Sequence, residues 1–191
     1  MLHDNFECSF AAHRELIGPT EQACREPLMR LAALAAAALT AKGCIFLFGN
    51  GGSAADAQHM AAEFAIRFIK DRKALAAIAL TTDSSALTAC GNDLGFDRVF
   101  SRQLEALGRP GDVAIGFSTS GNSPNVIAAL EVAQAQGLTA AAFTGYEGGK
   151  LGRIADPLIA VPTRETARIQ EMHILLGHIF CAEVEHLLGV G

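Results

Sequence analysis

Short apolar runs recur along the chain from residue 44 onward, and longer amphipathic stretches separate them. The short runs have the length and continuous hydrophobicity of strands buried on both faces, and they cover residues 44–48, 75–80, 113–117, 138–143 and 158–161. The longer stretches predict helices over residues 54–68, 85–90, 97–107, 124–136 and 165–188. Because strands and helices alternate, the pattern predicts an α/β fold with a doubly wound, five-stranded parallel sheet and helices on both faces.

The first 42 residues differ from the rest because their pattern is helical throughout. Gly18 and Pro19 predict a break after a first helical segment, since proline interrupts a helix that it enters. Pro27 suits the first turn of a second helix, which would continue over residues 28–40 toward Gly43. Since no linker or internal repeat divides the chain, we expect one domain over residues 1–191, with a helical N-terminal segment (1–42) and an α/β core (43–191).

The composition narrows the class of protein. A chain of 191 residues can bury a core without disulfides or a structural metal. The five cysteines are far apart and odd in number, without a C-x-x-C pair, which predicts reduced and mostly buried thiols. An alanine-rich composition that is 50% hydrophobic fits closely packed helices, and it also fits burial between subunits.

Charge and hydropathy exclude two kinds of partner. The formal charge is -5 and the 15 basic residues are dispersed, so no patch is expected to bind a nucleic-acid backbone. The longest apolar stretch, residues 31–39, is too short to cross a bilayer, and Asp4 and Glu7 stand where a signal peptide has cations. We therefore expect a cytoplasmic protein with no nucleic-acid partner and no membrane partner.

Two loops rich in glycine and hydroxyl side chains each join a predicted strand to a predicted helix. They are Gly49-Asn50-Gly51-Gly52-Ser53 and Ser118-Thr119-Ser120-Gly121-Asn122-Ser123. At such a junction, backbone N–H groups and the positive end of the helix converge on an anion. Ordinary turn and capping chemistry uses the same residue types, so the first loop alone decides little. Two such loops at the carboxyl ends of strands in one sheet favour phosphate binding.

Residues that known phosphate-binding motifs require are missing here, and their absence limits the kinds of phosphate ligand that the loops could bind. Neither loop ends in the Gly-Lys-Ser/Thr of a P-loop, which disfavours ATP hydrolysis. Gly49, Gly51 and Ala54 match a dinucleotide fingerprint loosely, but the acidic residue expected about 20 positions later is missing, and Asp83 is the nearest candidate at a strand end. Hydroxyls and neutral amides without a basic anchor suit a monophosphate on a small polar molecule, such as a sugar phosphate.

Two predicted helices carry side chains that could move protons or bind a metal. His59 and Glu63 are four residues apart and share a helical face, although an isolated pair of this kind is more often only a surface contact. On the C-terminal helix, Gln170 and His178 are about 80° and 12 Å apart, so they could border one cavity from its two ends. Carboxylate and imidazole suit the interconversion of a ketose and an aldose, and a divalent metal held by histidine, glutamate and an amide oxygen would polarise the carbonyl.

Taken with Gly91-Asn92-Asp93 and Arg168-Ile169-Gln170-Glu171, the two loops make the sequence resemble the phosphoheptose isomerases of the sugar-isomerase (SIS) fold over nearly its whole length. The resemblance implies conversion of sedoheptulose 7-phosphate to D-glycero-D-manno-heptose 7-phosphate through an enediol. It also implies that Glu63 and His178 are the acid/base pair. Finally, it implies a homotetramer whose active sites form between subunits.

The resemblance assigns further residues one by one. It implies one zinc or similar divalent ion per subunit, held by His59, Glu63, Gln170 and His178. It implies substrate contacts from both loops, from the segment after residue 90 and from two helices, namely Asn50, Gly51, Gly52, Ser53, Glu63, Asn92, Asp93, Ser118, Thr119, Ser120, Ser123 and Gln170.

One departure and one rival accompany this interpretation. Some relatives have an aspartate just before the arginine, where this chain has Ala167 before Arg168. The rival is a non-enzymatic binding module, either a sugar-phosphate sensor or an SIS relative that binds the bacterial replication initiator and has a similar Arg-Ile-Gln-Glu-Met-His segment. That initiator-binding relative lacks acidic and imidazole equivalents of Glu63 and His178, so their presence here favours the enzyme.

Overall fold

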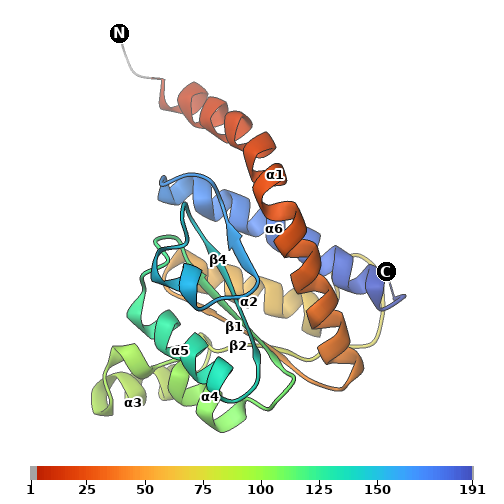
Figure 1. Ribbon diagram of the computed structural model, residues 1–191, viewed down its shortest axis with the longest axis vertical. Helices are drawn as coiled ribbons and strands as arrows, with labels where there is room; N and C mark the ends of the chain where they lie inside the picture. Colours follow the sequence, from red (N-terminus) through yellow and green to blue (C-terminus); the bar gives the residue numbers. More distant parts are fainter. Residues whose placement is uncertain (1–3, 191) are drawn as a thin grey trace.

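The computed structural model, which describes residues 4–190, has one parallel sheet between two layers of helices (Figure 1). The strands are β1 (Ile45–Gly49), β2 (Ala77–Ala79), β3 (Val113–Ser118), β4 (Thr139–Thr144) and β5 (Leu158–Ala160). Their order across the sheet is β2-β1-β3-β4-β5, and every neighbouring pair is parallel. The predicted α/β class and five-stranded parallel sheet are confirmed.

The helices divide between the two faces of the sheet. The first layer has α1 (Asn5–Thr40), α2 (Gly52–Ala65) and α6 (Thr166–Leu187), and the second has α3 (Ser84–Asp93), α4 (Ser101–Leu107) and α5 (Pro124–Ala135). Alternate residues of a strand point to opposite faces, so Ile45 and Leu47 join the first core while Phe46 and Phe48 join the second. Because both faces are buried, the central strands read as continuous apolar runs.

Most predicted elements are present, with shifted ends. The edge strand β2 is shorter than predicted, and the predicted helix over 97–107 is divided into a 3₁₀ turn, η1 (Phe96–Arg98), and α4. Val99 and Phe100 lie between the two pieces and are buried, and the Phe100 ring packs 5.5 Å from that of Phe48. A second 3₁₀ turn, η2 (Gly149–Arg153), follows β4.

The predicted break at Gly18 and Pro19 is wrong, because α1 is one helix of 36 residues that contains Pro19 and Pro27. Both prolines follow exposed residues by one turn, so the carbonyl groups that lose a partner can bond to water. Packing against the rest of the fold compensates the remaining cost, since α1 lies across α6 and β5 (Figure 1) and buries side chains at Leu16, Thr20, Cys24, Leu28 and Leu31. Tertiary contact therefore overrides the local signal for a helix end.

The cysteines and the hydropathy of the helices agree with the sequence analysis. Cys24, Cys90 and Cys181 are buried, and burial raises the pKa of the Cys24 thiol to about 11. None of the helices within residues 4–190 combines the length and the apolar composition that a membrane span requires.

One histidine of α6, His173, belongs to the core. Its side chain is fully buried beside the rings of Phe117 and Phe143, and its Nε2–H donates to the carbonyl oxygen of Thr144 at 3.1 Å. Burial lowers the pKa of His173 to about 4, and the hydrogen bond to Thr144 only partly opposes that effect. The neutral ring is thus a structural group between α6 and the sheet.

We expect His173 to make the protein less stable as the pH falls from about 6.5 to about 4. The unfolded chain binds a proton at this residue below pH 6.5, whereas the folded chain binds it only near pH 4, so the stability present above pH 6.5 is lost across that window. The loss corresponds to about 3 kcal/mol. Urea unfolding of the wild type and of His173→Leu at several pH values measures it, because the carboxylates titrate in both proteins; parallel curves would contradict the prediction.

Candidate active site

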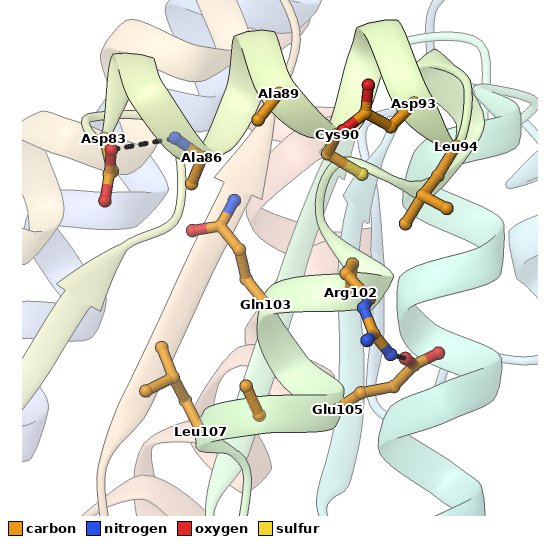
Figure 2. A pocket seen from close by; sticks show the side chains of 11 residues that line it. Asp83, Ala86, Ala89, Cys90, Asp93, Leu94, Arg102, Gln103, Glu105 and Leu107 are labelled. Carbon is orange, nitrogen blue, oxygen red and sulfur yellow. Dashed lines mark hydrogen bonds and ion pairs between the residues drawn. The ribbon is translucent and has the colours of Figure 1, made fainter.

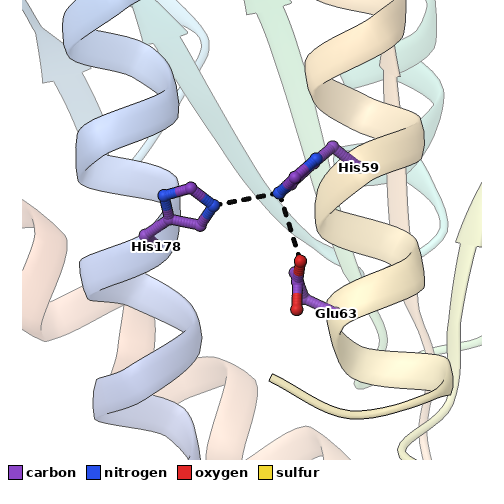
Figure 3. A group of neighbouring side chains, drawn as sticks. All are labelled: His59, Glu63 and His178. Carbon is purple, nitrogen blue, oxygen red and sulfur yellow. Dashed lines mark hydrogen bonds and ion pairs between the residues drawn. The ribbon is translucent and has the colours of Figure 1, made fainter. Parts of the chain in front are cut away.

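Three polar side chains from two helices meet on the first layer (Figure 3). His59 and Glu63 come from α2 and His178 comes from α6. The Nε2 atom of His59 lies 2.9 Å from Nε2 of His178 and 3.1 Å from Oε1 of Glu63. The potential ligand atoms of all three residues lie within 4.8 Å of one another. The structure therefore brings the predicted acid/base pair together and joins His59 to it.

Protons alone satisfy this arrangement poorly. If His178 donates its Nε2–H to His59, then Nε2 of His59 has no hydrogen to offer Glu63, and two lone pairs face each other across 3.1 Å. If His59 donates instead, its single hydrogen must serve both neighbours. A cation between the three atoms would accept a lone pair from each, so the donor set fits a metal ion.

The site exists because α2 and α6 run side by side in the same direction at close range. Gly177 makes this approach possible, because a side chain there would begin 2.8 Å from Sδ of Met60. Phe64 and Phe180 continue the contact with ring centroids 5.5 Å apart. The neighbours of Met60 and Gly177 in sequence are His59 and His178, so this packing sets the spacing of the polar group.

An aromatic residue just beyond the end of α2 covers His178. The ring of Phe68 is stacked on the imidazole of His178 at 5.6 Å, and His59 approaches the same ring edge-on at 5.0 Å. Both contacts restrict the orientation of His178, which leaves fewer rotamers to be lost when a ligand binds.

The two glycine- and hydroxyl-rich loops lie next to each other, since β1 and β3 are neighbours in the sheet. The side chains of Asn50 and Asn125 connect them through two reciprocal amide hydrogen bonds of 2.9 and 2.8 Å. Asn125 is buried in the first turn of α5, and the sequence analysis missed it. Its signal in the sequence was a polar residue directly after Pro124, just before the apolar run of residues 126–130.

Some polar groups of the second loop form hydrogen bonds within that loop. The hydroxyl groups of Ser118 and Ser123 are 2.9 Å apart, and Ser120 Oγ accepts from the backbone N–H of Asn122 at 3.2 Å. In the first loop, Gly51 has a φ of 56°, and no side chain caps the start of α2. Ser123 likewise makes no side-chain cap at the start of α5. Both helix N-termini thus remain suited to an anion.

Gln170, the fourth predicted metal ligand, lies at the beginning of α2. Its amide nitrogen is 2.5 Å from the position that a Cβ atom on Gly52 would occupy, so Gly52 makes room for it. His59 is seven residues further along α2, a rise of about 10 Å. Within one chain the structure therefore places Gln170 against the first loop, apart from the three-residue group.

The charged residues beside Gln170 connect α6 to α1. Arg168 donates to the carbonyl oxygen of Ser9 at 2.8 Å and pairs with Glu171, whose other oxygen is 2.7 Å from Nδ1 of His13. These contacts give the Arg-Ile-Gln-Glu motif a structural role alongside any role of Gln170.

Asn92 and Asp93 lie on the second layer, at the end of α3. The Asn92 amide donates to the Asp93 carboxylate at 2.7 Å. Asp93 lines an open hollow of about 760 Å³ between α3 and α4, together with Asp83, Cys90 and Gln103 (Figure 2). No residue of either loop lines this hollow in the part of the chain that the structure describes. A single chain thus keeps these two predicted contacts away from the rest.

The sequence analysis also missed Asp56, which lies on α2 one turn before His59. One of its carboxylate oxygens is buried without a hydrogen-bond partner among the described residues. Burial raises the pKa of Asp56, and the charge of a protonated His59 acts in the opposite direction. The three-residue spacing to His59 was the signal that could have identified it.

Comparison with known proteins gives one consistent result. The family model of the SIS domain matches residues 10–145. The phosphoheptose isomerase of Paramagnetospirillum magneticum is 61% identical over 175 residues, covering 92% of this chain and 91% of that protein. That of Aquifex aeolicus is 56% identical over 163 residues, or 85% of each chain. A solved phosphoheptose isomerase from Neisseria gonorrhoeae superposes with a TM-score of 0.91 at 47% identity and covers 97% of this chain and 100% of that chain.

We expect Gly177→Leu to destabilise the protein by about 2 kcal/mol, because the new side chain would collide with Met60 and force α2 away from α6. Adding Met60→Ala should recover part of that loss by vacating the space, so the double variant should cost less than the two single variants combined. Chemical denaturation of the four proteins measures this coupling. Strictly additive losses would contradict the close packing described for these helices.

Proposed function

The chain belongs to the phosphoheptose isomerase family of SIS-domain proteins, and on that basis we propose that its reaction takes place at His59, Glu63 and His178. The protein is a sugar-phosphate isomerase that acts on sedoheptulose 7-phosphate. Family membership supports the isomerase over the non-enzymatic binding module considered in the sequence analysis. The convergence of the three side chains from α2 and α6 is the observation that supports this location.

In the proposed mechanism, Glu63 and His178 divide the proton transfers between carbon and oxygen. Glu63 removes a proton from C1 of the ketose while His178 donates one to the carbonyl oxygen on C2, and an enediol forms. His178 then accepts the proton of the C1 hydroxyl, and Glu63 returns its proton to C2. The product is the aldose D-glycero-D-manno-heptose 7-phosphate. Each residue regains its starting protonation state, and no oxidant or reductant is needed.

Zinc is the metal that we assign to this group. Two imidazole nitrogens and a carboxylate oxygen are ligands that zinc prefers, and they leave a coordination position for substrate. The three donor atoms lie within 4.8 Å of one another, and two of the contacts between them measure 2.9 and 3.1 Å. His59, Glu63 and His178 would hold the ion through the atoms that face one another, and it would polarise the substrate carbonyl when bound. The second carboxylate oxygen of Glu63 and Nδ1 of His178 would then carry the protons. Gln170 as a fourth ligand stays a prediction.

The substrate phosphate is assigned to the two neighbouring loops. Backbone N–H groups at the start of α2 and α5 offer donors, and the reciprocal Asn50–Asn125 bonds keep the loops at a fixed separation. Ser53, Ser118, Thr119, Ser120 and Ser123 add hydroxyl groups around them. Gly51, Gly52 and Gln170 complete this end of the site. This assignment puts the phosphate at the edge of the sheet and the reacting carbons along α2.

We extend the proposal to assembly and location. A homotetramer would bring Asn92 and Asp93 of one chain toward the site of another, which a single chain does not do. It would also cover apolar side chains beside the site, since Ile66 and Ile69 are 72% and 71% exposed. A single domain over residues 1–191 and a cytoplasmic location stay predictions.

Glu63→Gln and His178→Gln should each lower kcat by at least about 100-fold while the protein stays folded, because each removes one proton carrier. Turnover of sedoheptulose 7-phosphate, together with circular dichroism, measures the effect. Glu131→Gln and His186→Gln are matched controls, since both residues are exposed and lie away from the three-residue group. Variants of Glu63 and His178 that keep the rate of these controls would exclude the assigned roles.

Zinc should bind at one ion per chain, and His59→Ala should weaken that binding by more than about 100-fold, because one of three donors is lost. Competition against a chromogenic chelator measures the affinity without relying on activity. His186→Ala serves as the control for loss of a histidine. Equal affinities of the His59→Ala protein and the wild type would place the metal elsewhere.

A further inference from the structure

The last turn of α2 carries Glu63, although the end of a helix is the part that frays most easily. Helix α2 ends at Ala65, and the final carbonyl groups of a helix have no partner within it. The carbonyl oxygen of Ala62 accepts from the N–H of Ile66 at 2.9 Å. The carbonyl oxygens of Glu63 and Phe64 need partners from outside the helix.

The backbone N–H of Leu75 donates to the carbonyl oxygen of Phe64 at 3.1 Å, and one guanidinium group bonds to both carbonyl oxygens. Arg72 Nη2 donates to the carbonyl oxygen of Glu63 at 2.7 Å, and Nη1 donates to that of Phe64 at 2.8 Å and to that of Lys73 at 3.1 Å. A cation at this end also opposes the negative pole of the helix dipole, and the last turn of α2 itself contains no basic residue. Arg72 therefore works as a C-terminal cap for the turn that holds Glu63.

The same side chain reaches α6. Arg72 Nε donates to Oε1 of Glu185 at 2.5 Å, and both side chains are only 3% exposed. Glu185 is seven residues after His178, which is two helical turns, so the two residues lie on the same face of α6. Burial raises the pKa of the Cys181 thiol, and the charges of Glu63 and Glu185 raise it further, as expected if all three lie close together.

We propose that Arg72 is a positioning residue for the isomerase reaction, because it fixes the last turn of α2 and the carboxylate of Glu63 relative to His178 on α6. This inference rests on the role of Glu63 proposed above. Arg72 itself is too deeply buried to contact substrate. Its planar fork has five N–H donors, so it can serve three carbonyl oxygens and a carboxylate at once.

The test must separate positioning from stability, since removing Arg72 alone would leave Glu185 buried and unpaired. The double variant Arg72→Met/Glu185→Leu removes both charges and keeps an apolar contact of similar volume, so it should fold. We expect its kcat to fall by about 10- to 100-fold at a temperature well below its unfolding midpoint, with KM for sedoheptulose 7-phosphate changed by less than about threefold.

Asp112→Ala is the matched control for loss of a buried charge. Asp112 is 5% exposed and accepts from the N–H groups of Cys44 and Arg109, at the edge of the sheet opposite the loops. This variant should lose stability and keep the kcat of the wild type. Hydrogen exchange gives a second readout: in the double variant the amide of Ile66 should exchange faster, while amides in the middle of α2 stay protected.

The outcomes distinguish the two proposals. If Glu63→Gln lacks turnover but Arg72→Met/Glu185→Leu keeps the kcat of the wild type, the positioning role is wrong and the catalytic role stands. If Glu63→Gln keeps full turnover, the proposed role of Glu63 fails, and the positioning role fails with it. A fall in kcat of equal size in Asp112→Ala would show that general destabilisation is the cause, and would also overturn the inference.

Discussion

The close parallel packing of α2 on α6 is the contact on which the candidate active site depends. Gly177 has no side chain, so Met60 can lie directly over α6 and bring His59 and His178 to 2.9 Å. Phe64 and Phe180 fill the space beyond, and Arg72 closes the far end by bonding to both helices. The polar groups meet at this distance because the apolar residues around them pack closely and hold α2 and α6 together.

The sheet imposes the second constraint. Because β1 and β3 are neighbours, their carboxyl ends deliver two helix N-termini to one place, and a phosphate there could accept hydrogen bonds from both. The Asn50–Asn125 pair makes this arrangement rigid at the cost of one buried amide on α5. The proposed phosphate site and the proposed proton-transfer group therefore lie on different parts of the fold, the first on the loops at the sheet edge and the second on the helix pair beside it.

Local patterns predicted the repeating elements well because burial on both faces leaves a direct trace in the sequence. Strands β1 and β3 are fully buried, and their runs of apolar residues match. The same reasoning failed at Pro19, where a local break signal is real but packing of α1 across α6 outweighs it. It also gave no sign of Arg72, whose proposed role depends on hydrogen bonds to backbone carbonyl groups, and no side-chain pattern predicts those bonds.

By itself, the sequence determined the α/β class, the two glycine- and hydroxyl-rich loops that join a strand to a helix, and the motifs that identify an SIS-domain isomerase. The i, i+4 spacing put His59 and Glu63 on one face of a helix, because helical geometry is local. Only the tertiary structure decided that His178 joins them, that Gln170 lies instead at Gly52, and that Asn92 and Asp93 lie on the opposite layer. Those placements follow from how helices pack across a sheet, which depends on side-chain volumes far apart in the chain.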